Sequence, residues 1–104
     1  MTDPVDPNLA RLLPMARALS QPYRAEHALV SNQAKLRVVK FQGHFAQWHT
    51  HDEDECYVIL EGELLVELEG RAAIRLSVGD AYVVKAGTVH RPFAVPQALV
   101  LLVT

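Results

Sequence analysis

Three histidines and one glutamate are spaced like the ligands of a metal ion. His49 and His51 are separated by one residue, Glu55 follows four positions after His51, and His90 lies thirty-five positions further on. Side chains two apart on a strand project to the same face, so the first two imidazoles can reach one point. If the fold returns His90 to that point, the four residues form a three-histidine, one-carboxylate site for a divalent transition metal.

The ligand types leave the identity of the metal open. Imidazole and carboxylate groups accept Fe, Mn, Ni, Co, Cu or Zn, and the general order of affinities does not select among these ions. Four protein ligands on a six-coordinate ion leave two positions for water, dioxygen or an oxygen ligand, which allows Lewis-acid or oxygen-activating chemistry. The hypothesis depends on the joint spacing, because a single strand histidine is usually a half-buried side chain with a satisfied hydrogen bond.

Tyr57 is the candidate catalytic residue. If Glu55 faces the metal on a regular strand, Tyr57 shares its inward face, and a phenol there is a candidate general acid or base. The alternative is an aromatic side chain packed in the core with its hydroxyl group hydrogen-bonded. Cys56 has the opposite parity, which indicates a buried spacer rather than a nucleophile.

The elements that must position these residues are mostly short strands. After residue 34, β-rich runs recur about every ten residues, which is typical of an all-β antiparallel sandwich or barrel. The expected strands cover residues 35–41, 45–50, 56–60, 63–69, 71–76, 81–84, 88–94 and 98–103.

The first 34 residues have a different pattern, with four of the six prolines. Apolar residues at helical spacing from Leu9 to Leu19 predict one short helix, with Asp6 and Pro7 as its cap and Pro14 as a break. We therefore expect an N-terminal extension with a short helix at residues 1–34 and a β-barrel domain at residues 35–104.

Composition restricts the classes of partner. The 104 residues suffice for one domain, and ten Lys and Arg against twelve Asp and Glu give a net charge of -2 without a basic run. These values argue against nucleic acid as a partner. The longest apolar run, residues 98–103, is too short to cross a bilayer, and residues 1–22 have no signal-like apolar stretch. A lone cysteine suits a reducing compartment, so we expect a cytoplasmic protein with no membrane partner.

Two motifs in residues 35–104 resemble those of the cupin family. The first is Gly43, His49, His51, Glu55 and Gly62 at the usual cupin spacing. The second contains Gly79, Lys85, Ala86, Gly87, His90 and Ala94. It departs from the family pattern at Lys85, where cupins usually have proline, and at Ala94, where they often have asparagine. Loss of the proline removes a fixed φ from the turn before His90.

The resemblance implies a small single-domain cupin, a jelly-roll barrel with a metal ion in its mouth held by His49, His51, Glu55 and His90. It permits dioxygenases, isomerases and lyases, and also non-catalytic binding domains, so the fold alone does not decide the function. We expect a metal-dependent enzyme acting on a small polar molecule; the alternative is a binding or sensing domain. Small cupins often form homodimers through an edge strand and the N-terminal segment, and Trp48 marks either a partner surface or a side chain covered by that segment.

Overall fold

The computed structural model describes residues 6–45 and 47–104, which contain one helix and seven strands. In chain order these are α1 (Leu12–Arg17), β1 (Glu26–Ser31), β2 (Ala34–His44), β3 (Glu55–Gly62), β4 (Leu64–Leu68), β5 (Arg71–Leu76), β6 (Ala81–Val84) and β7 (His90–Val103).

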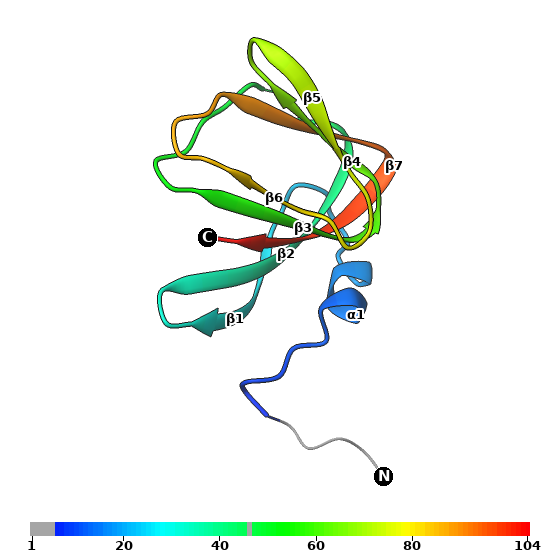
Figure 1. The fold of residues 1–104 in the computed structure, drawn as a ribbon. Coiled ribbons are helices and arrows are strands. Elements are labelled where there is room, and N and C mark those ends of the chain that lie inside the picture. The colour runs from blue at the N-terminus through cyan, green and yellow to red at the C-terminus, as the bar shows by residue number, and fades with distance from the viewer. Residues whose placement is uncertain (1–5, 46) are drawn as a thin grey trace.

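Strand β7 joins the two layers of the fold. Residues 98–103 pair with both β2 and β3, which gives the strand order β1-β2-β7-β3-β6. Residues 90–93 pair with β4, whose other neighbour is β5, and residues 93 and 94 also pair with β2. Figure 1 shows β7 running from the layer with β4 and β5 into the layer that contains the C-terminus. All of these pairings are antiparallel, so the expected all-β antiparallel architecture is confirmed.

Strand alternation builds the core between the layers. On β3, Tyr57 and Ile59 are buried while Cys56 and Val58 are only partly covered, as the period of two requires. The same alternation buries every second residue of β4. The main buried cluster consists of Val39, Phe41, Tyr57, Ile59, Leu64, Val66, Leu68, Leu76, Val84, Ala94, Ala98, Val100 and Leu102.

Helix α1 covers the outer face of the sheet. Ala16 and the following Leu19 form a second buried cluster with Val38 of β2 and Leu99 of β7. The expected break at Pro14 is wrong. Pro14 lies in the first turn of α1, where a backbone N–H has no hydrogen-bond partner within the helix, so the missing N–H costs nothing. No helix in the described residues is long and apolar enough to cross a membrane.

The N-terminal segment also holds a strand that sequence analysis missed. Strand β1 pairs antiparallel with β2 from Glu26 opposite Val38 to Ser31 opposite Ala34. The expected cap at Asp6 is wrong, since α1 starts at Leu12 after Arg11 and the Asp6 carboxylate accepts a hydrogen bond from the Asn8 N–H.

Three of the expected strands also change. Residues 90–94 and 98–103, expected in two strands, belong to the single strand β7, and residues 88 and 89 lie outside it. The strand expected at residues 45–50 is absent from residues 45 and 47–50, where His49 makes only an isolated bridge with His90. Residue 46 lies outside the described residues.

Candidate metal centre

Three histidines converge where the loop before β3 meets the start of β7. One ring nitrogen from each of His49, His51 and His90 lies within 4.8 Å of the others. The backbone holds two of them together: the His49 N–H donates to the His90 carbonyl at 3.0 Å, and the His90 N–H donates to the His49 carbonyl at 2.9 Å. This bridge explains how residues far apart in the chain reach one point.

Glu55 completes the cluster from the first position of β3. Its Oε1 lies 3.8 Å from Nε2 of His51 and 3.8 Å from Nε2 of His90, and its side chain is 12% exposed. Burial by itself raises the pKa of Glu55, but the neighbouring His90, Tyr57 and His51 lower it further, so the net pKa lies below the ordinary value. Glu55 is therefore an ionised carboxylate at neutral pH.

The hydrogen bonds of two histidines leave Nε2 free to bind a metal ion. His90 Nδ1 lies 2.9 Å from the Thr88 carbonyl oxygen, and His49 Nδ1 lies 3.1 Å from the Gln47 carbonyl oxygen. A carbonyl only accepts, so Nδ1 carries the proton of the neutral ring and Nε2 keeps its lone pair. Metal-binding histidines are oriented in this way by their other ring nitrogen.

His90 provides the test of whether this site fits a metal ion. Its Nε2 is buried and has no hydrogen-bond partner among the described residues, and a buried polar atom without a partner is costly. A cation at the point shared with His49, His51 and Glu55 would satisfy this lone pair. The donor set of imidazole and carboxylate suits a divalent transition metal. The residues present therefore fit the metal ion.

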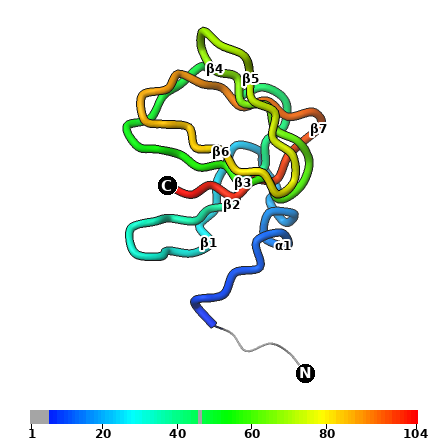
Figure 2. Tube along the Cα trace, viewed as in Figure 1, coloured from blue at the N-terminus to red at the C-terminus, as the bar shows by residue number. Residues whose placement is uncertain are grey.

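Hydrogen bonds connect the turn before His90 to the loop that carries His51. The Lys85 ammonium and the Ala86 N–H both donate to the Asp54 carboxylate, at 2.6 Å and 2.8 Å. The Gly87 N–H donates to the His51 carbonyl at 2.9 Å. Figure 2 shows these two loops side by side, one before β3 and one between β6 and β7. Asp54 thus holds the turn, at the position where cupins usually have a proline, mainly through its hydrogen bonds with Lys85 and the Ala86 N–H.

A cavity of about 390 Å³ opens beside the cluster and is lined by His49, His51 and Glu55. Tyr57 also lines it, on the inward face expected from strand alternation, and is 1% exposed. Burial, together with the charge of Glu55, raises the pKa of Tyr57 far above its ordinary value, so the phenol keeps its proton at neutral pH. Phe45 also lines the cavity, whereas Gln47 lies outside this lining and contributes its carbonyl to His49.

Three residues of this cavity with polar side-chain groups were not expected from the sequence. Tyr23 and Arg24 come from the segment before β1, and Arg37 comes from β2. The sequence carries a signal for Arg37, because it alternates with Val39 and Phe41 on the inward row of β2. No pattern indicated the segment before β1, since only the tertiary fold brings it to the cavity.

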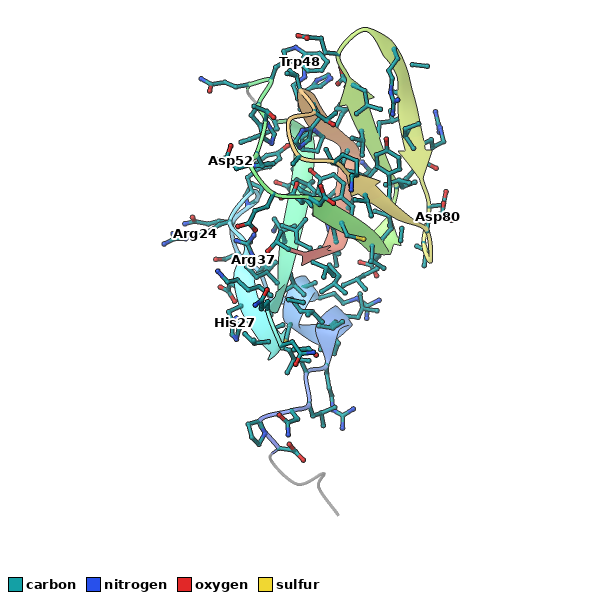
Figure 3. The ribbon with its side chains drawn as sticks, turned by 60° about the vertical axis from the view of Figure 1, so that its left-hand side comes forward. Arg24, His27, Arg37, Trp48, Asp52 and Asp80 are labelled. Carbon is teal, nitrogen blue, oxygen red and sulfur yellow. The ribbon has the colours of Figure 1, made fainter. Side chains whose placement is uncertain are left out.

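Trp48 and the two remaining histidines lie outside the cluster. Trp48 is 44% exposed, and the Arg91 guanidinium lies 4.7 Å from the centre of its ring. Figure 3 shows Trp48 at the end of the molecule away from α1, so the described N-terminal residues do not cover it. His44 pairs with Glu67 at 2.8 Å, and His27 is exposed on β1.

Comparisons with known proteins agree with this architecture. The profile of the cupin domain family matches residues 37–104. The chain belongs to the cupin family. This cupin is 34% identical to the uncharacterized protein YdbB of Bacillus subtilis (strain 168) over 79 residues, which cover 71% of this chain and 69% of YdbB.

Solved structures show the same cupin fold. A cupin-2 domain protein from Shewanella frigidimarina NCIMB 400 superposes with a TM-score of 0.86 at 24% identity, covering 93% of this chain and 94% of that protein. Hydroquinone 1,2-dioxygenase from Sphingomonas sp. TTNP3, solved with 4-hydroxybenzoate bound, has a TM-score of 0.84 at 14% identity, covering 90% of this cupin and 31% of the dioxygenase. The cupin fold expected from the two motifs is therefore confirmed.

Proposed function

We propose that this cupin is a metal-dependent enzyme acting on a small polar molecule that binds in the 390 Å³ cavity. The observation that carries the proposal is the buried Nε2 of His90, which makes no hydrogen bond within the described residues and lies beside two further histidines. In a purely structural barrel, a buried imidazole nitrogen without a hydrogen bond only costs stability. A metal site, in contrast, requires a ring nitrogen whose lone pair is free.

Four residues would hold the ion: His49, His51, His90 and Glu55. The bound metal supplies Lewis-acid or oxygen-activating chemistry. The carbonyls of Gln47 and Thr88 keep two of the rings in the tautomer that exposes Nε2.

Tyr57 is the proposed catalytic residue. Because its pKa is raised, its hydroxyl group acts at neutral pH as a proton holder and hydrogen-bond donor rather than as a base. Its hydroxyl group lies beside Glu55, so it also orients that carboxylate. The neighbouring rings of Tyr23, Phe41 and Phe45 form one wall of the cavity.

Dioxygenase, isomerase and lyase chemistry all use such a centre. The fold is shared with hydroquinone 1,2-dioxygenase from Sphingomonas sp. TTNP3, which supports oxygen-dependent cleavage as the first reaction class to assay. A comparison of aerobic and anaerobic turnover separates it from isomerisation and elimination, because neither of these consumes dioxygen.

Metal analysis tests the proposal directly. Protein purified without chelators is expected to contain a stoichiometric transition metal, and His49→Ala and His51→Ala are expected to lose most of it because each removes a ligand. His27→Ala is the matched control, since His27 is exposed on β1 away from the cluster. Wild-type protein that stays metal-free after incubation with Fe, Mn, Ni, Co, Cu and Zn in turn would contradict the proposal.

The alternative function is non-catalytic binding of a small molecule. The raised pKa of Tyr57 favours it, because a phenol that holds its proton so tightly is a weak proton-transfer group. Turnover that disappears in Glu55→Ala would argue for the enzyme. Ligand binding without turnover, in metal-loaded protein, would argue for the binding domain.

We also propose a homodimer formed through an edge strand. Strand β1 ends the sheet order and pairs only with β2 among the described strands, and Val30 on it is 58% exposed. An open strand edge with apolar side chains is a common pairing surface. Sedimentation of wild type and of Val30→Lys tests this, and a monomeric wild type at micromolar concentration would contradict it.

A further inference from the structure

Arg37 is a charged residue on a row that otherwise builds the core. It shares the inward face of β2 with Val39 and Phe41, which are buried in the main cluster. Its side chain lines the cavity beside the histidines and also the wider hollow next to it. A guanidinium group at this position loses part of its hydration, so its presence needs a compensating partner.

The described residues provide no such partner for Arg37. Its Nε is buried and has no hydrogen-bond partner. Other arginines are paired in the structure: Arg17 with Glu61, Arg75 with Glu63 and Arg91 with Glu67. Because Arg37 lacks a carboxylate while these arginines have one, its fork of N–H donors is available to a ligand in the cavity.

The charge of the cavity favours an anion. Glu55 is the single carboxylate in its lining, against Arg24 and Arg37. The acidic residues Asp52, Glu53 and Asp54 line the neighbouring hollow, which Arg37 and Glu55 also border. A divalent cation on the histidines adds further positive charge next to Arg37. An anion placed between the ion and this guanidinium is therefore attracted from both sides.

The wall of the cavity fits an apolar, flat body attached to that anion. Tyr23 stacks on Phe45 with ring centres 5.3 Å apart, and Phe41 lies 5.5 Å from Tyr23. The Tyr23 hydroxyl donates to the Gly43 carbonyl at 2.8 Å, which fixes this ring in place. Figure 3 shows Arg37 and Arg24 on the same side of the molecule as Asp52, where the segment before β1 meets the loop before β3.

We propose that this cavity binds an organic carboxylate, with Arg37 pairing with the carboxylate group and the rings of Tyr23, Phe41 and Phe45 packing on the organic body. The proposal rests on the proposed function, because it names the class of molecule that reaches the same metal centre. Arg37 is the specificity-determining residue. The planar fork of a guanidinium matches the two oxygens of a carboxylate, which favours this group over a neutral amide. The apolar wall favours a molecule with a ring over inorganic phosphate, which has no organic body.

Calorimetric titration of the metal-loaded protein with benzoate, benzamide and inorganic phosphate tests the proposal. Benzoate is expected to bind at least tenfold more tightly than benzamide, which has nearly the same shape without the charge, and more tightly than phosphate. Arg37→Met is expected to weaken benzoate binding by about tenfold to a hundredfold, the range for a hydrogen bond to a charged group. It should leave benzamide binding unchanged, and Arg37→Lys should restore benzoate binding only in part.

Arg75→Met is the matched control, because it removes an arginine paired on the surface with Glu63. Equal binding of benzoate and benzamide, no binding of benzoate, unchanged benzoate binding in Arg37→Met, or tighter binding of phosphate would each overturn the proposal. The metal content of Arg37→Met should equal that of wild type. If wild type takes up no metal but still binds benzoate through Arg37, the proposed function fails and the carboxylate site stands.

Discussion

At the scale of single residues, the protonation states decide whether the site can take a metal ion. Burial lowers the pKa of His49. Burial also acts to lower the pKa of His90, but the nearby Glu55 carboxylate and the Thr88 carbonyl outweigh it, and the net pKa is raised. A metal ion must displace any proton on Nε2, so these two rings compete with protons in different pH ranges.

Metal affinity is therefore expected to fall as the pH decreases. The pKa of His90 lies above the ordinary histidine value of about 6.5, and the pKa of His49 lies below it. Each histidine that must lose a proton adds roughly a tenfold loss of affinity per pH unit below its pKa. Competition titrations against a chromophoric chelator from pH 8 to pH 5 measure this slope, and a flat profile would argue against histidine ligation.

At the scale of elements, two loops rather than two strands place the ligands. Sequence alternation suggested that His49 and His51 share a strand face, but residues 47–50 make only the His49–His90 bridge. The position of the second loop depends on Asp54, which accepts hydrogen bonds from Lys85 and from the Ala86 N–H. The hydrogen bond with Lys85 is the main reason that the pKa of Asp54 lies below its ordinary value.

Removal of these contacts is expected to weaken metal binding in a fixed order. Asp54→Ala removes both hydrogen bonds and should weaken it most, whereas Lys85→Met removes only the exposed ion pair and should have a small effect. Glu53→Ala is the control, because this exposed neighbour makes no hydrogen bond or ion pair with the turn among the described residues. Metal dissociation constants of the three variants check the order. Equal affinities for Asp54→Ala and wild type would show that the turn needs no such support.

The glycines of the cupin motifs have different physical roles at this scale. Gly62 ends β3 with φ +80°, and a Cβ there would collide with the backbone oxygen of Gln97 in β7. Gly43, with φ +64°, has no such neighbour, so only its backbone conformation requires glycine. The motif spacing predicted both positions, but only the structure shows that one of them is needed for close packing.

At the scale of the whole molecule, the proposed ligands link the loop before β3, the start of β3 and the start of β7. An ion bound only by the folded chain stabilises all three together. This coupling distinguishes a true site from a chance cluster of surface histidines, because a chance cluster gains little stability from metal.

Metal is therefore expected to raise the thermal midpoint of unfolding. A free metal concentration about 100 times the dissociation constant contributes about 2.7 kcal/mol, which for a domain of this size corresponds to roughly 10 °C or more. Calorimetric scans with and without metal, after treatment with a chelator, measure the shift. His51→Ala should lose most of it and His27→Ala should keep it. An identical midpoint in apo and metal-loaded wild type would contradict the site.

The sequence by itself determined the all-β architecture, most of the strands between residues 55 and 84, their inward faces and the four candidate ligands. Alternation fixes which side of a strand is buried, and Tyr57 and Ile59 on β3 follow it. The spacing of His49, His51, Glu55 and His90 indicated a shared site because metal chemistry restricts ligand types more strongly than packing restricts core residues.

Only the tertiary structure decided what surrounds those ligands. Tyr23 and Arg24 reach the cavity from a segment read as a helical extension, and β1 lies beside β2 through pairings between chain segments. The partnerless Nε2 of His90 and the unpaired Nε of Arg37 are likewise properties of three-dimensional packing. A sequence pattern records local periodicity, whereas the absence of a hydrogen-bond partner depends on every segment that folds against the atom.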